Sequence, residues 1–160
     1  MAHITIEYVI MLPILILQII LFPLTASWLM NVWVDSRRNL ALEEVASHLG
    51  STIQQVYFTL NHETISEVHN FTHTPEVPKF IEGIPYIGNA TLKTVFDPSL
   101  NSSKVLELTL KLKGIETTVK TSVLLGQNAF WKDSTFVSNS TNASIQAEKL
   151  NGTIVLWFGG

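Results

Sequence analysis

The first apolar pattern in the chain is a continuous one. From Tyr8 to Val34, twenty-seven residues in a row include no Lys, Arg, Asp, Glu or His. A helix of this length reaches ~40 Å, whereas the hydrocarbon core of a bilayer is roughly 30 Å thick. The run therefore predicts a membrane-spanning helix. The alternatives fit less well, because a cleaved secretory signal has a shorter apolar core after a basic segment and a buried helix of a soluble protein seldom exceeds about 20 residues.

Beyond Val34 the apolar positions become periodic. Spacings of three and four residues connect Leu42, Val45, Leu49, Ile53, Val56 and Leu60. This spacing predicts one apolar stripe on an amphipathic helix that continues to about Leu60, outside the hydrocarbon. We expect the stripe to pack against the chain's own C-terminal domain. Pro13 and Pro23, in the apolar half, should each remove a backbone hydrogen bond and bend or locally unwind the helix.

From about Asn61 the apolar period changes from 3.6 to 2, which is typical of half-buried strands. Leucines alternate with polar residues over 105–113, and a second alternating run follows Gly114, so a β-hairpin is predicted to turn near Lys113 and Gly114. Shorter strands are predicted at 91–96, 134–137, 144–149 and 153–158. The predicted class is α+β: a long N-terminal hydrophobic helix followed by a small antiparallel β-sheet or sandwich domain.

This pattern divides the 160 residues into three parts. Residues 1–60 are predicted to form an N-terminal helical stem, of which 8–34 would lie in a membrane and 35–60 are amphipathic. Residues 61–88 hold three prolines and are predicted to be a connector, and residues 89–160 are predicted to form the β-domain. A further globular domain does not fit, since ordinary domains need about 100–150 residues.

Charge and motif content exclude several classes of function. The net charge is −3 and the basic residues are scattered, so the chain lacks the basic patch of a nucleic-acid binder. There is no Cys, no Gly-rich phosphate loop and no nucleophile elbow. His69 and His73 have the spacing of a helical metal pair, but a glycan on Asn70 between them would crowd the ligands. We therefore predict no catalytic residue, no metal and no cofactor, and hence no enzyme.

Asparagine is arranged unusually in the C-terminal part. Six of the seven asparagines after position 61 stand in an Asn-x-Ser/Thr triplet, the acceptor sequence for N-linked glycans: Asn70, Asn89, Asn101, Asn139, Asn142 and Asn151. Chance would place far fewer of the seven there, and none of Asn31, Asn39 and Asn61 is in such a triplet. Because glycan transfer requires an exposed loop on the outer side of a membrane, these residues predict N-linked glycans and an outward-facing C-terminal domain.

Two arginines favour the opposite topology. Arg37 and Arg38 follow the apolar run at once, and the positive-inside rule places such residues on the cytoplasmic side. We give the six acceptor triplets more weight, because the charge rule is a statistical bias.

The N-terminal sequence carries a resemblance. The run from Ile6 to Pro13 has a glutamate, an aromatic residue, an apolar stretch and a proline, and it resembles the start of TadE-like and archaeal type IV pilin-like subunits. The resemblance implies that Glu7 pairs with the free α-amine of a neighbouring subunit. Counting back places that amine on His3, after a cut by a prepilin peptidase-like enzyme behind Ala2. Only two residues precede this cut, whereas pilin leaders usually carry basic residues.

The pattern and the resemblance together predict a homo-oligomeric subunit of an extracellular helical filament, like a type IV pilus, that serves surface adhesion. The subunit would be inserted in the membrane before assembly and would reach the cell surface in the filament, with Glu7, His3 and Pro13 as assembly residues. The alternative is a single-pass, membrane-anchored surface glycoprotein that forms no filaments. Solubilised protein distinguishes the two: helical polymers favour the filament subunit, and discrete particles favour the surface glycoprotein.

Overall fold

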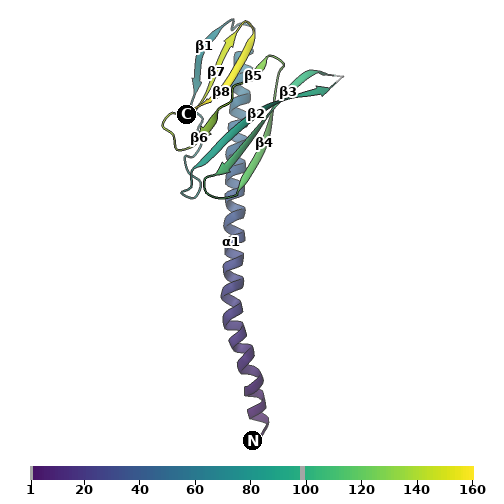
Figure 1. Ribbon diagram of the computed structural model, residues 1–160, viewed down its shortest axis with the longest axis vertical. Coiled ribbons are helices and arrows are strands. Elements are labelled where there is room, and N and C mark those ends of the chain that lie inside the picture. The colour runs from purple at the N-terminus through teal and green to yellow at the C-terminus, as the bar shows by residue number, and fades with distance from the viewer. Residues whose placement is uncertain (1, 98–99) are drawn as a thin grey trace. The chain divides into compact units, whose positions relative to one another are not determined.

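The computed structural model describes residues 2–97 and 100–160, and the side chains of residues 9–95 and 103–160. In this part of the chain, one long helix, α1 (Ala2–Leu60), is followed by two four-stranded sheets (Figure 1). The α+β class predicted from the sequence is therefore confirmed. The chain divides into two compact units, an N-terminal unit, Met1–Arg37, and a C-terminal unit, Arg38–Gly160.

The N-terminal unit is helical throughout its described residues, and neither proline unwinds it. Pro13 and Pro23 both lie inside α1, so of the two predicted effects, bending or local unwinding, the unwinding is wrong. Each proline still removes one N–H from the helical ladder. Next to Pro23, the Thr25 hydroxyl lies 3.1 Å from the Leu21 carbonyl oxygen and 2.9 Å from that of Phe22, and it can donate to either. The Thr25 side chain thus adds a hydrogen bond to a backbone carbonyl close to the point where Pro23 removes a backbone donor.

The C-terminal unit contains both sheets. In the first sheet the strand order is β1 (Val68–His73), β7 (Ser144–Leu150), β8 (Thr153–Gly159) and β5 (Ala129–Trp131). In the second the order is β4 (Thr118–Leu125), β3 (Leu100–Leu112), β2 (Tyr86–Asp97) and β6 (Thr135–Val137). Strands β5 and β8 pair in parallel, and the other described pairs are antiparallel.

The predicted hairpin is confirmed. Strands β3 and β4 pair antiparallel, and the pair nearest the turn is Lys111 with Thr118. The four leucines of β3 that alternate with polar residues are fully buried: Leu106, Leu108, Leu110 and Leu112. This face of the sheet supplies a large part of the core.

Two strands differ from the sequence expectation. The segment 61–88 is not only a connector, because it contains β1 and the start of β2, and β1 pairs with β7. Strand β5 was not predicted either. Both are hard to see in sequence, since β1 has a register shift between Val68 and Phe71 and β5 is three residues long.

The second half of α1 packs on the sheets as predicted. All six residues of the stripe from Leu42 to Leu60 are buried. Gly50 shows how close this contact is, because a Cβ built there would lie 2.8 Å from Cγ2 of Val123 in β4. A larger residue would push the helix away from the sheet. The Gln54 side chain adds a polar contact by donating to the Leu124 carbonyl at 3.2 Å.

The C-terminal end of α1 is held by a buried lysine. Lys149 in β7 is 6% exposed, and its ammonium group donates to the carbonyl oxygens of Leu60 at 2.7 Å, His62 at 3.3 Å and Ile65 at 2.6 Å. The last carbonyls of a helix have no partner within the helix, and a cation near them is also favoured by the helix dipole. Lys149 therefore ties the end of α1 to the first sheet.

The two sheets meet where β6 lies near β8. The Phe136 and Phe158 rings are 5.4 Å apart in an edge-on arrangement, and the Ser134 hydroxyl accepts a hydrogen bond from the Phe158 N–H at 2.8 Å. Phe136 also stacks on Tyr86, whose hydroxyl donates to the Pro78 carbonyl at 2.7 Å. Burial raises the pKa of Tyr86 to about 12. The helix stripe and both sheets thus contribute to one continuous core.

Candidate functional site: an apolar helix and exposed acceptor asparagines

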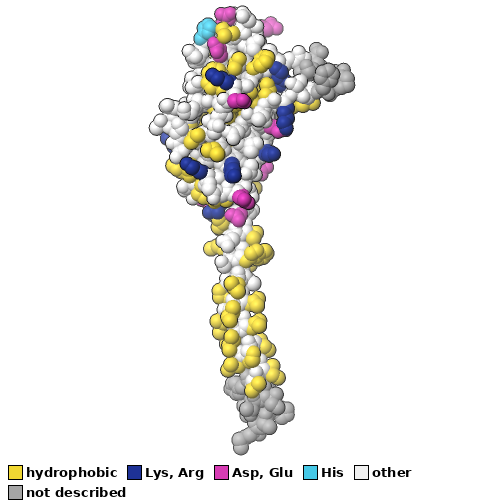
Figure 2. Space-filling model, viewed as in Figure 1, with side chains coloured by type: hydrophobic (Ala, Val, Ile, Leu, Met, Phe, Trp, Pro, Cys, Tyr) yellow, Lys and Arg dark blue, Asp and Glu magenta, His cyan; other side chains and the backbone are white. Residues whose placement is uncertain are grey.

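The N-terminal unit presents an uncovered apolar surface. Its large apolar side chains from Val9 to Trp33 are between 50% and 77% exposed. These residues follow one another almost without a gap along α1, so they lie on all sides of the helix, and Figure 2 shows those on one face. An exposed apolar surface of this extent is unusual for a soluble monomer and marks a membrane or protein contact.

Length and composition make this helix compatible with membrane insertion. Of the described helices, α1 is long and apolar enough to cross a bilayer, and its most apolar stretch has no buried residue. A core helix of a soluble protein of the same composition would be mostly buried. At the end of the apolar run, the Arg37 guanidinium lies 4.8 Å from the centre of the Trp33 ring, a cation–π contact at the point where charge begins.

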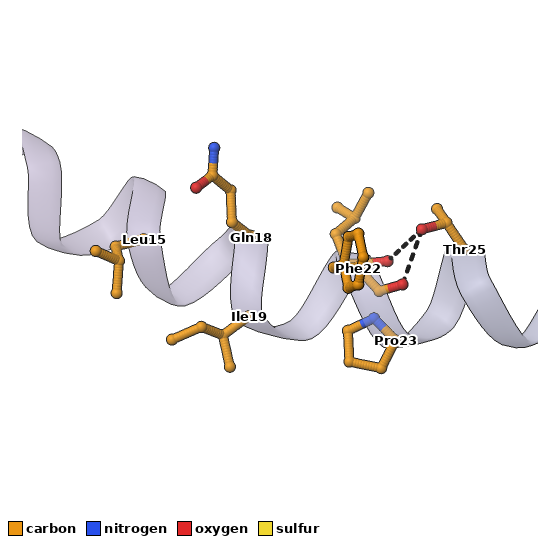
Figure 3. Close-up of a pocket in the computed structure, with 7 residues that line it drawn as sticks. Leu15, Gln18, Ile19, Phe22, Pro23 and Thr25 are labelled. Carbon is orange, nitrogen blue, oxygen red and sulfur yellow. Dashed lines mark hydrogen bonds between the residues drawn. The ribbon is translucent and has the colours of Figure 1, made fainter.

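A shallow hollow on this helix does not form a ligand site. It is lined by Leu15, Gln18, Ile19, Leu21, Phe22, Pro23 and Thr25. Figure 3 shows that Ile19 and Pro23 point to one side of the helix whereas Gln18 points to another. The hollow is therefore ordinary space between side chains on a bare helix surface. Gln18 and Thr25 are the polar side chains of the hollow, and the Gln18 amide can form a hydrogen bond with a neighbouring helix.

The two assembly residues nearest the N-terminus are not tested by the structure. The side chains of Glu7 and His3 lie outside the described residues. Pro13 lies inside α1 with an exposed side chain.

Five of the six acceptor asparagines have described side chains, and all five are exposed: Asn70, Asn89, Asn139, Asn142 and Asn151. The side chain of Asn101 lies outside the described residues. Asn151 and Gly152 form the turn of the β7–β8 hairpin with φ of 50° and 76°, values that fit a type I′ turn. Asn70 also has a positive φ, 57°, at the irregularity in β1.

Exposure alone does not select these asparagines. Asn31, Asn39 and Asn61 are exposed too, so the acceptor triplet is what distinguishes the two groups. The seventh asparagine of the C-terminal part has a structural role instead. Asn128 accepts a hydrogen bond from the Tyr57 hydroxyl at 2.6 Å and donates to Gly152 at 2.8 Å. Asn128, which stands outside an acceptor triplet, thus connects α1 to the turn of the β7–β8 hairpin.

No metal centre is assigned. His69 and His73 both lie on strand β1, so their spacing is not that of a helical pair, and His69 Nδ1 lies 3.6 Å from a carboxylate oxygen of Glu148. In the described part of the chain, no group of three or more His, Asp or Glu side chains is placed to hold a metal ion.

Comparison of the chain with protein-family models, with curated proteins and with solved structures finds no match.

Proposed function

We propose that the chain is a structural subunit of an extracellular helical filament of the type IV pilin kind, stored in the membrane through its apolar helix and then assembled through it. The observation that carries the proposal is the bare apolar surface of α1 between Val9 and Trp33. Two environments can cover such a surface on all sides, namely lipid and other apolar helices. A pilin-like subunit uses both in turn.

The energetics require close packing in the second environment. Lipid chains are as apolar as leucine, so the hydrophobic effect gives little gain when the helix leaves the bilayer for a helical bundle. Van der Waals contacts and hydrogen bonds between helices must therefore drive assembly. Gln18 and the backbone carbonyls released by Pro13 and Pro23 are polar groups that neighbouring copies can satisfy.

The C-terminal unit supports the proposal because it has its own core. Among the described residues, the buried core of this unit consists of residues from Leu42 onward, on the stripe of α1 and on the two sheets. This unit can remain folded while the apolar helix exchanges lipid for protein neighbours. In the proposed assembly, Glu7 pairs with the α-amine of His3 in a neighbouring copy, which would offset the cost of an ionised carboxylate among apolar helices.

Glycosylation of native protein provides one test of the outward topology. We expect glycans on several of the six acceptor asparagines and none on Asn31, Asn39 or Asn61, because only the former stand in the acceptor triplet. Site-resolved mass spectrometry of protein from its native membrane measures this. Six bare asparagines would remove the main support for an extracellular C-terminal unit.

Imaging tests the filament itself. Electron microscopy of the native cell surface should show helical filaments, and mass spectrometry of purified filaments should identify this chain as a main component. Glu7→Gln keeps the size of the side chain and removes the charge, so the variant should insert in the membrane at the normal level while filament yield falls.

Two outcomes would contradict the proposal. If solubilised native protein forms only discrete particles and no filament contains the chain, the single-pass surface glycoprotein is the better assignment. If Glu7→Gln filaments are as numerous as those of the unaltered protein, the pairing of Glu7 with a neighbouring amine is wrong.

A further inference from the structure

A polar groove lies on the face of the first sheet opposite to the core. It has a volume of about 570 Å³ and extends over β1, β7 and the end of β8. Its hydrogen-bonding side chains are Thr72, Thr74, Thr141, Asn142, Ser144 and Gln146. None of the side chains that line it is ionisable, so the groove offers hydroxyl and amide groups rather than charge.

Strand register brings the central groups of the groove together. Thr72 of β1 pairs with Gln146 of β7, and Gln146 pairs with Trp157 of β8, so the three side chains form one row across the sheet. The indole N–H of Trp157 donates to Oε1 of Gln146 at 2.8 Å, which fixes the orientation of the carboxamide. No described residue accepts a hydrogen bond from Nε2 of Gln146. Nε2 can therefore donate to a ligand where the Gly159 backbone does not cover it.

A glycine in β8 lets two polar side chains of the groove lie close to the strand. Gly159 continues strand β8, and its φ is not in the left-handed region, so the backbone does not require glycine there. A Cβ built at this position would collide with the Ser144 hydroxyl and with the carboxamide of Gln146. Gly159 thus allows the Ser144 hydroxyl and the Gln146 carboxamide to pack directly against the backbone of β8.

The Trp157 ring adds a rigid apolar surface to these polar groups. Besides its bond to Gln146, the ring has the Lys132 ammonium 5.6 Å from its centre. Both contacts hold the indole in place. A rigid aromatic ring beside hydroxyl and amide groups suits a ligand with many neutral hydroxyls and one apolar face.

We infer that this groove binds an uncharged saccharide. Sugars carry several hydroxyls that both donate and accept hydrogen bonds, and their C–H faces pack against aromatic rings. Binding sites of this kind combine a few convergent polar groups with apolar surface. An anionic ligand fits less well, because the Lys132 ammonium beside the lining lies over the Trp157 ring rather than among the hydroxyl and amide groups. The inference concerns the C-terminal unit alone and does not depend on filament assembly.

Two sources can supply the saccharide. Asn142 itself lines the groove and stands in an acceptor triplet, so a glycan attached there begins at the groove. The other source is a separate glycan, on a neighbouring copy or on another surface. The chemistry is the same in both cases, and only the first source rests on the proposed glycosylation.

The test uses the full-length protein in detergent, prepared in a host without N-glycosylation. Saturation-transfer NMR measures binding of neutral oligosaccharides, with a uronic-acid oligosaccharide as the charged comparison. We expect binding of at least one neutral saccharide, with Gln146→Leu and Thr74→Val each weakening it about tenfold, the effect of one lost hydrogen bond. Gln127→Leu, outside the groove, is the matched control and should bind normally.

The same measurement on native glycosylated protein identifies the source. If the native protein does not bind added saccharide and enzymatic removal of its N-linked glycans restores binding, the chain's own glycan occupies the groove. If the native protein binds as well as the bare protein, the ligand is a separate glycan. The inference is overturned if no neutral saccharide binds the bare protein, if the uronic acid or an extended peptide binds in its place, or if Gln146→Leu and Thr74→Val bind as tightly as the unaltered protein.

Discussion

Leu49→Ala should strongly destabilise the C-terminal unit. Leu49 is 0% exposed and lies beside Gly50, where α1 packs closely on Val123 of β4. Truncating a fully buried leucine costs about 2–5 kcal/mol, out of a typical domain stability of about 5–15 kcal/mol. In thermal melts of a soluble fragment of residues 35–160, we expect the midpoint to fall by roughly 8–20 °C.

Leu40→Ala is the matched control for this experiment. It makes the same chemical change on the same helix, but Leu40 is 63% exposed, so the free energy of unfolding should change by less than about 0.5 kcal/mol. Equal melting temperatures for the Leu49→Ala fragment and the unaltered fragment would mean that the stripe contributes nothing to the core. The architecture described for the C-terminal unit would then be wrong.

The elements that could be predicted from sequence are those in which the spacing of apolar residues matches the face that the fold buries. The stripe from Leu42 to Leu60 repeats every 3.6 residues because one side of the helix faces the sheets. The leucines of β3 repeat every two residues because one face of that strand is buried. In both cases the local pattern and the final environment agree, and prediction succeeds.

Strand β1 shows where this reasoning fails. Its burial does not alternate, and the positive φ of Asn70 accompanies an irregularity that shifts the register against β7. A period of two is lost at such a bulge. The strand forms because it pairs with β7, and its own sequence has no alternating apolar pattern. From sequence alone the segment was therefore predicted to be a connector.

The candidate sites divide in the same way. An acceptor triplet is three adjacent residues, so all six asparagines could be found from sequence. The groove depends on the register of three strands, which places Thr72, Gln146 and Trp157 in one row although they are distant in the chain. From sequence, Lys149 was predicted only to be part of a strand. Its role at the end of α1 depends on three carbonyls of residues 60–65, which are distant from it in the chain.

Leu15→Asp should abolish filament assembly without unfolding the C-terminal unit. Leu15 is 57% exposed in the N-terminal unit, on a surface without charge from Val9 to Val34. In the proposed filament an aspartate there would lie among apolar helices with no cation to pair with, and removal of a charge from water without a partner costs several kcal/mol. One aspartate near the centre of the helix makes membrane insertion less favourable by about 2.5–3.5 kcal/mol. Insertion should persist, because many apolar residues remain. Electron microscopy counts the filaments, and membrane fractionation measures insertion.

Leu15→Met separates the effect of charge from that of shape. Methionine conserves the volume and the apolar character of leucine, so this variant should assemble at close to the normal level. Limited proteolysis of detergent-solubilised Leu15→Asp should still release the resistant 38–160 fragment, because the described core residues of that unit all lie after Arg38. If Leu15→Asp forms normal numbers of filaments, the apolar helix does not lie in a filament core. If Leu15→Asp inserts normally and Leu15→Met loses as many filaments as Leu15→Asp does, close packing rather than exclusion of charge controls assembly at this position.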